Sequence, residues 1–124
     1  MKVISLIFIL LLSACASHQV EVIDPIKDPI RFGLHSKRDE YRSCFLESES
    51  YKGRNSNTDG VVMAGFTINK LGVPTEIKIL ESPFKDPNFH ACLQGIIGLI
   101  RFPPSKDGGY TTVTQPISFS AVPN

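Results

Sequence analysis

The stretch DPNFHACLQGIIGLIRFPP, residues 86–104, decides the fold. Asp86 is a residue type that caps helices, and Pro87 suits the first helical position. The Phe-Pro-Pro sequence at 102–104 ends the helix, because proline cannot continue one. Between these signals, apolar side chains recur at helical spacing on one face: Phe89, Cys92, Leu93, Ile96, Ile97 and Ile100. The stretch therefore predicts an amphipathic helix that packs against a sheet.

A β-hairpin is predicted immediately before this helix. Residues 61–68 and 73–79 alternate between two faces, and residues 69–72 supply the turn between them. The second strand carries charged side chains on one face, which predicts that this face meets water.

A last strand is predicted after the helix, over residues 111–121. Three apolar residues share one of its faces: Val113, Ile117 and Phe119. Pro116 lies inside the strand and favours an edge position, because proline cannot donate a ladder hydrogen bond.

A first helix is predicted ahead of the hairpin. Ser36 followed by Asp39 is a helix-start signature, since serine accepts a hydrogen bond from a free N–H group and the acid suits the positive end. A stripe at helical spacing follows, and the helix fades near Lys52: Tyr41, Cys44, Phe45 and Ser48. The order helix, strand, strand, helix, strand predicts an α+β fold, a small antiparallel three-stranded sheet with two helices on one face.

Residues 1–14 have the features of a signal peptide. Lys2 precedes an apolar run of about ten residues, too short to span a bilayer as a helix, and small residues follow it. The order Leu-Ser-Ala-Cys at 12–15 resembles the bacterial lipobox, in which the cysteine receives a diacylglycerol and an acyl chain. The alternative is an ordinary signal peptide with a chance cysteine at its end.

The lipobox resemblance implies signal cleavage between Ala14 and Cys15 and a lipid anchor on Cys15. Several acyl chains together anchor a protein stably, whereas one holds it only marginally. Ala16 and Ser17 stand where some bacterial lipoproteins carry an aspartate that keeps them in the inner membrane. The resemblance therefore implies the outer membrane, with the domain facing the periplasm.

The remaining chain is expected to divide into a tether, 15–35, and a domain, 36–124. The tether contains Asp-Pro-Ile twice, and each proline favours extended geometry at the residue before it. Residues 20–23 are an alternative candidate for a short added strand.

The charge balance argues against a nucleic-acid partner. The chain has 13 basic and 12 acidic side chains, and loss of the signal removes Lys2. A mature domain without net charge lacks the electrostatic footprint of nucleic-acid binding. The sequence also contains no Gly-x-Ser-x-Gly elbow or paired-carboxylate arrangement, so we predict no catalytic residue, metal or cofactor beyond the lipid.

The three cysteines form an odd set, and lipidation of Cys15 accounts for the extra one. Cys44 and Cys92 lie on the apolar stripes of two helices that share one face of the sheet, so we expect a disulfide in an oxidising compartment. A metal site or an activated thiol using His90 is the alternative. His90 is two residues from Cys92, however, and such residues point apart on a helix.

A set of apolar and turn residues is spread over residues 36–121: Gly60-Val61-Val62, Phe66-Thr67-Ile68, Gly72-Val73, Ile79, Ser82, Phe89, Cys92, Phe102-Pro103-Pro104 and Pro116-Ile117-Ser118-Phe119. Together they resemble the C-terminal domain of TonB-type energy transducers. The paired helix cysteines and the Phe-Pro-Pro stop are most similar to the AgmX/PglI C-terminal type, known from gliding-motility proteins. Such motifs specify a fold better than an activity.

The TonB resemblance implies binding by strand addition, in which an extended partner segment pairs with a sheet edge. Carried over to this chain, the edge is the last strand, with Thr112, Val113, Thr114 and Ile117 as contact residues. A transducer needs an inner-membrane helix and a long spacer, whereas this chain has a lipid anchor and a tether of about twenty residues. We therefore expect a non-enzymatic adaptor for an envelope protein, with dimerisation left open.

Two other functions remain open at this point. The first is a structural accessory subunit of a secretion or motility machine, which would use the helix face at Glu47 and Glu49. The second, more remote, is a thiol enzyme, which would need Cys44 or Cys92 free.

Overall fold

A computed structural model describes residues 22–52 and 59–120 of the chain. The elements follow the order α1 (Pro29–His35), α2 (Arg38–Leu46), α3 (Glu49–Lys52), β1 (Gly60–Ile68), β2 (Pro74–Glu81), α4 (Pro87–Leu99) and β3 (Thr111–Phe119). The predicted signal peptide, its predicted cleavage site at Ala14 and Cys15, and the first half of the candidate strand at 20–23 lie outside the described residues. Residues 22 and 23 are described and are not in a strand.

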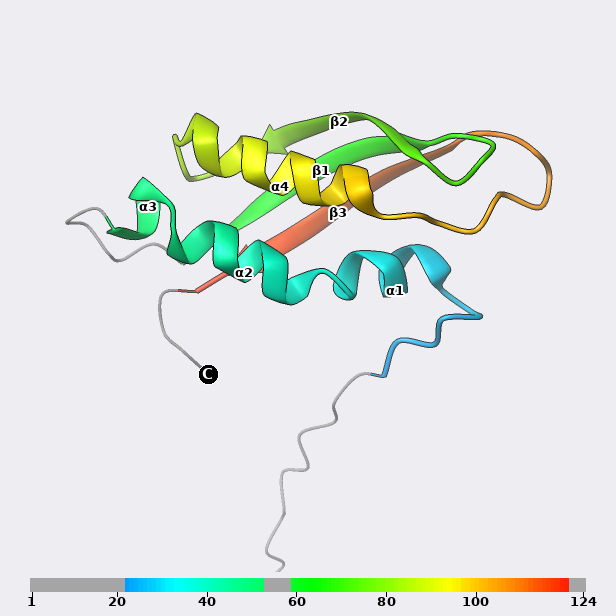
Figure 1. Ribbon diagram of the computed structural model, residues 1–124, viewed down its shortest axis with the longest axis horizontal. Helices are drawn as coiled ribbons and strands as arrows, with labels where there is room; N and C mark the ends of the chain where they lie inside the picture. The colour runs from blue at the N-terminus through cyan, green and yellow to red at the C-terminus, as the bar shows by residue number, and fades with distance from the viewer. Residues whose placement is uncertain (1–21, 53–58, 121–124) are drawn as a thin grey trace, which may run out of the picture.

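The three strands form one antiparallel sheet in the order β2-β1-β3, with helices on one of its faces (Figure 1). Along β1, every second side chain points to the helices, and these four are almost fully buried: Val62, Ala64, Phe66 and Ile68. The predicted α+β fold class is therefore confirmed. In the described part of the chain the helices lie on one face of the sheet, which we call the helix face; the opposite face, which we call the open face, carries Val61, which is half exposed.

The helix α4 begins as its sequence predicts. Asp86 is the N-cap and accepts a hydrogen bond from the backbone N–H of Phe89 at 3.1 Å, and Pro87 is the first helical residue. Phe89, Leu93 and Ile97 are buried on its inner face. The core next to them is aromatic, with the ring of Phe119 centred 5.1 Å from that of Phe89. The end of β3 is thus held against the start of α4.

The N-terminal helix differs from the prediction. Three helices, α1 to α3, stand where one was predicted. The first begins at Pro29, with Asp28 as its N-cap and a 3.0 Å hydrogen bond from the N–H of Arg31. Ser36 does not cap α2; its hydroxyl donates to the carbonyl of Gly33 at 2.6 Å. The second Asp-Pro of the predicted tether therefore starts a helix in the same way that Asp86-Pro87 does.

The domain boundary predicted at residue 35 is accordingly too late. Leu34 is only 4% exposed and belongs to the main core cluster. A Cβ placed on Gly33 would lie 2.9 Å from the ring of Phe102, so α1 packs closely on the segment that follows α4. Residues 29–35 are part of the folded domain and not of a tether.

The predicted first helix also ends earlier than expected. It stops at Leu46, and the short α3 follows after two residues. Ser48 forms the junction, since its hydroxyl donates to the carbonyl of Phe45 at 2.6 Å and accepts from the N–H of Tyr51 at 3.2 Å. A serine that supplies both bonds replaces the backbone bonds that a continuous helix would make. In the described part of the chain, no helix combines the length and apolar character needed to span a bilayer.

Candidate functional site

Among the residues that the structure describes, β3 has β1 on one side and no strand on the other. Its register with β1 is unbroken, from Thr111 opposite Ile68 to Phe119 opposite Gly60. An edge strand of this kind presents backbone groups to which another chain can pair. The predicted edge position of the last strand is therefore what the structure has.

The four residues predicted for this edge divide into two pairs. Thr112 and Thr114 are on the open face, and both are exposed. Val113 is 8% exposed and belongs to the core, and Ile117 is partly buried against it. The sequence therefore identified the strand, but the side chains of Val113 and Ile117 contribute to the domain's own packing.

Pro116 indicates which backbone groups of β3 face the free side. It stands opposite Met63 within the regular register, although it has no N–H to give to β1. Since successive residues of a strand point their backbone groups to opposite sides, Thr114 and Ser118 face the same side as Pro116. Their N–H groups then point outward, while those of Val113, Gln115 and Ile117 point to β1. The proline consequently sits in the middle of the free edge without breaking the sheet.

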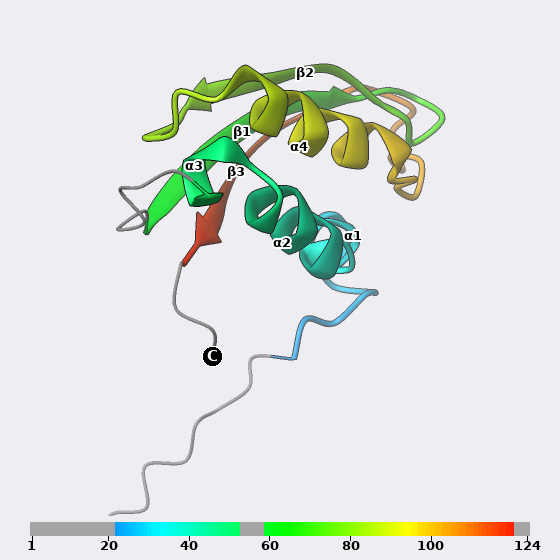
Figure 2. The same ribbon diagram turned by 60° about the vertical axis from the view of Figure 1, so that its left-hand side comes forward.

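Two adjoining hollows lie between β3 and the α1–α2 pair, with volumes of about 380 and 270 Å³. We call them together the β3 groove. Figures 1 and 2 show α1 and α2 next to β3, with α2 at an angle to the strand. Both hollows are lined by Arg38, Tyr41, Ile117 and Ser118. The groove therefore borders the free edge on the side of the sheet that carries the helices.

The β3 groove is rich in basic side chains from the helices. Arg31 and His35 line one hollow, Arg42 lines the other, and Arg38 lines both. Asp39 is the acidic residue that lines it. These residues were not among the predicted site residues, although the spacing of 31, 35, 38 and 42 by four, three and four positions is a helical stripe. That spacing is the signal that could have found the groove.

Tyr41 is the buried polar residue of the groove. It is 5% exposed, and its hydroxyl has no hydrogen-bond partner among the described residues. Burial raises the pKa of Tyr41 well above its ordinary value, and the negative charge of Glu40 adds to this rise. The phenol therefore stays protonated and keeps a hydrogen to donate.

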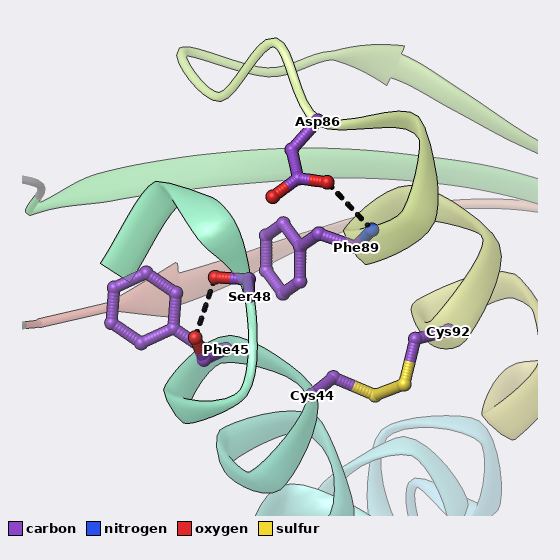
Figure 3. Close-up of a disulfide and its surroundings, with 6 residues drawn as sticks. All are labelled: Cys44, Phe45, Ser48, Asp86, Phe89 and Cys92. Atoms are coloured by element: carbon purple, nitrogen blue, oxygen red, sulfur yellow. Dashed lines mark hydrogen bonds between the residues drawn. A yellow bond between two sulfur atoms is a disulfide. The ribbon is translucent and has the colours of Figure 1, made fainter. Parts of the chain in front are cut away.

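A disulfide joins Cys44 of α2 to Cys92 of α4, with the two Cα atoms 5.9 Å apart (Figure 3). That separation is within the usual range for a disulfide. His90, considered in the sequence as a partner for these thiols, instead has its Nε2 atom 2.8 Å from the hydroxyl of Ser82. Among the described residues, no group of three His, Cys, Asp or Glu side chains is arranged to hold a metal ion.

Asp86 links the start of α4 to α3. Besides capping α4, it accepts hydrogen bonds from the N–H of Ser50 at 3.2 Å and from its hydroxyl at 3.1 Å. Burial acts to raise the pKa of Asp86, but the bonds from Phe89 and Ser50, with the nearby His90, outweigh it and leave the pKa below its ordinary value. The carboxylate therefore remains charged and holds α3 beside α4 close to the disulfide (Figure 3).

Comparison with solved structures finds the NMR solution structure of the C-terminal domain of TonB from Helicobacter pylori. The two superpose with a TM-score of 0.51 at 25% sequence identity, over 74% of this chain and 97% of that one. No protein-family model and no curated protein sequence matches the chain. The described domain therefore has a TonB C-terminal-like fold.

Proposed function

We propose that this chain is a non-enzymatic envelope lipoprotein whose domain binds another protein by strand addition to the free edge of β3. The observation that carries the proposal is the unbroken nine-residue β3, one side of which pairs with no strand of the described residues. The TonB C-terminal-like fold supports the proposal, since the resemblance of the sequence to that family implied binding at the sheet edge. Strand addition draws its affinity from main-chain hydrogen bonds and its selectivity from alternate side chains.

The free edge has groups suited to such pairing on both sides of its proline. Thr114 and Ser118 offer outward N–H groups. Pro116 between them has no donor, and its carbonyl accepts a 3.3 Å hydrogen bond from the side-chain amide of Gln115. A partner strand would therefore make its bonds at Thr112 and Thr114 and again at Ser118. The missing donor at Pro116 also reduces unspecific edge-to-edge aggregation, because proline on an edge strand is a known protection against it.

Anchoring belongs to the same proposal. The lipobox-like residues 12–15 support cleavage after Ala14 and lipid on Cys15, with the domain facing the periplasm from the outer membrane. With α1 folded, the segment from Cys15 to Asp28 is the proposed tether, and its reach is at most ~50 Å at about 3.5 Å per residue. The two helix cysteines and the Phe-Pro-Pro sequence support kinship with the AgmX/PglI type.

The test is photo-crosslinking in cells from single positions of the full chain. A crosslinker at Thr114 or Ser118, on the free edge, should trap one discrete partner. The matched control is Glu76, an exposed position on β2, the other edge of the sheet. Crosslinks that appear equally from Glu76 and Thr114 would contradict binding at β3.

A role as a structural accessory subunit is the second candidate. A hollow of about 220 Å³ beside the disulfide is lined by Glu47, Glu49 and Asn88, among others, and Glu47 and Glu49 are exposed. This surface lies away from β3. Loss of partner capture on reversing the charge of Glu47 and Glu49, with Thr114 and Ser118 substitutions silent, would favour this candidate. The thiol-enzyme alternative needs a free cysteine, whereas both helix cysteines are joined here.

A further inference from the structure

We propose that the β3 groove selects a partner segment with acidic side chains at alternate positions. The inference rests on the proposed function, strand addition at β3, and names the chemistry of the partner. It is argued from three features of the groove: where it lies relative to an added strand, its charge, and the unpaired hydroxyl at its base.

The groove lies where an added strand would direct half of its side chains. Side chains of a strand alternate between the two faces of the sheet, so every second partner residue would point to the helix side. On β3 that side carries Gln115 and Ile117, both of which line the groove. The other partner residues would meet the open face beside Thr114 and Pro116. The groove therefore lies on the side of the sheet to which one alternating set of partner side chains points.

The spacing of the arginines matches the spacing of that set. Arg38 and Arg42 are four residues apart on α2, a rise of about 6 Å along the helix. Alternate side chains of a strand are about 7 Å apart. Arg38 lines both hollows and Arg42 lines one of them, so the two arginines are placed along the groove. The helix α2 lies next to β3 at an angle to the strand (Figures 1 and 2).

The charge of the groove favours carboxylates in that set. Arg31, Arg38, Arg42 and His35 line it, and Asp39 opposes them. This concentration of basic groups occurs in a chain whose formal net charge is only +1. Arginine presents a planar fork of donors that matches a carboxylate, which makes it the suited residue for this recognition.

Tyr41 adds a neutral donor at the base of the groove. Tyr41 lines both hollows, and its hydroxyl is buried and has no hydrogen-bond partner among the described residues. Buried polar groups are normally hydrogen-bonded, and leaving one unpaired is costly. A partner carboxylate that lies between Arg38 and Tyr41 would accept its hydrogen bond. Binding would then satisfy a group that the free domain leaves unsatisfied.

The first experiment selects binders from a random octapeptide library displayed on phage, with the full chain in detergent as bait. Each recovered peptide is retested against Ser118→Pro, which removes an outward N–H of β3. Peptides that bind the wild type but not this variant are called β3-dependent. Enrichment of Asp or Glu at alternate positions among them is the expected result. β3-dependent peptides with no acidic preference would overturn the inference and leave the proposed function standing. Recovery of no β3-dependent peptide would overturn both.

The second experiment measures the affinity of the best acidic peptide for charge variants. Arg38→Glu with Arg42→Glu should weaken binding at least tenfold, about the factor expected for a lost charge-assisted contact. Lys78→Glu with Lys85→Glu makes the same change of charge at two exposed positions outside the groove and should leave the affinity within about twofold. Equal losses in the two pairs would show a general charge effect and overturn the inference.

Tyr41→Phe separates recognition from folding. It should weaken the acidic peptide several-fold while the unfolding temperature stays the same or rises, because the lost hydroxyl has no partner in the free domain. Unchanged affinity would remove Tyr41 from the site.

Vesicles of anionic phospholipid form the last arm of the test. Binding to vesicles that requires Arg38 and Arg42, without peptide binding, would assign the groove to lipid and overturn the inference.

Discussion

The two edges of the sheet are built differently. β3 pairs with β1 in one regular register along its whole length. β2 begins at Pro74 and pairs with β1 through two register shifts, and Glu76 within it has a φ of 52°. A non-glycine residue at positive φ and shifts of register both twist a strand away from regular pairing.

The difference indicates how one domain keeps one edge closed and the other open. Proline, bulges and charged side chains are known protections of an edge strand, and β2 has all three, with Glu76 and Lys78 exposed. The helix α4 also contacts β2, while the two hollows of the β3 groove lie between β3 and the α1–α2 pair. On β3 only Pro116 interrupts the free donors. Irregularity at β2 thus leaves β3 as the edge suited to a partner.

The largest expected effect comes from removing the disulfide that joins α2, on the β3 side of the domain, to α4, on the β2 side. Cys44→Ser with Cys92→Ser should lower the free energy of unfolding by about 4 kcal/mol, because the bond closes a loop with a sequence separation of 48. Urea denaturation of the oxidised protein measures the loss. Native-state hydrogen exchange should show α2, on the β3 side, opening before α4. Wild-type protein under reductant is the control and should match the double variant; a loss below about 1 kcal/mol would contradict the chain-entropy argument.

The turn that leads into β2 tests how that edge is fixed. Gly72 has a φ of 81°, and an added Cβ would collide with the backbone carbonyl of Phe102, whose N–H donates to the Gly72 carbonyl at 2.9 Å. We expect Gly72→Ala to cost about 3 kcal/mol of unfolding free energy. Gly108→Ala is the matched control, since φ is 69° there and no atom lies near the added Cβ. It should cost about 1 kcal/mol. Similar losses in both variants would show that conformation alone, and not the contact with Phe102, holds this turn.

Proline scanning tests the orientation inferred for β3. Gln115→Pro removes an N–H that points to β1 and should lower the free energy of unfolding by about 2 kcal/mol. Thr114→Pro removes an outward N–H and should leave stability nearly unchanged while abolishing partner capture. Thermal unfolding and crosslinking on the same pair of variants give both readouts. The opposite order of stabilities would reverse the inferred orientation and remove Thr114 and Ser118 from the free edge.

The smallest expected effect concerns the cap of α4, the helix that lies on β2. The pKa of Asp86 is lower in the folded protein than in the unfolded chain, so its stabilising contribution is complete above about pH 4 and is lost as pH falls through the lowered folded value. Asp86→Asn keeps an acceptor for the cap but does not titrate. The difference in unfolding free energy between wild type and this variant should shrink, by about 1 kcal/mol, between neutral and strongly acidic pH. A difference that stays constant with pH would contradict the lowered pKa.

The sequence alone predicted the elements whose signals are local. The cap and first proline of α4, the alternation along β1, and an edge position for a strand containing Pro116 were all legible from a few neighbouring residues. The fold class followed from their order. Nearest-neighbour chemistry dominates at these positions, because a cap or an alternating stripe needs no distant residue to be read.

Other elements depend on contacts that the sequence does not display. Asp24-Pro25 and Asp28-Pro29 look alike, yet only the second starts a helix. A seven-residue helix is too short to be stable alone, and α1 is retained because Leu34 is buried and Gly33 fits against Phe102. The position of α3 after this break likewise depends on a distant residue. Asp86, 36 residues from Ser50, accepts hydrogen bonds from the N–H and the hydroxyl of Ser50.

The candidate site divides along the same line. The sequence by itself determined a three-stranded sheet with an edge at β3 and two helix cysteines placed to pair. Only the tertiary structure decided that Val113 and Ile117 serve the core, that β2 is the irregular edge, and that basic side chains and Tyr41 line a groove beside β3. The physical reason is that periodicity reports which face a residue is on, whereas the space between two elements is set by packing among residues far apart in the chain.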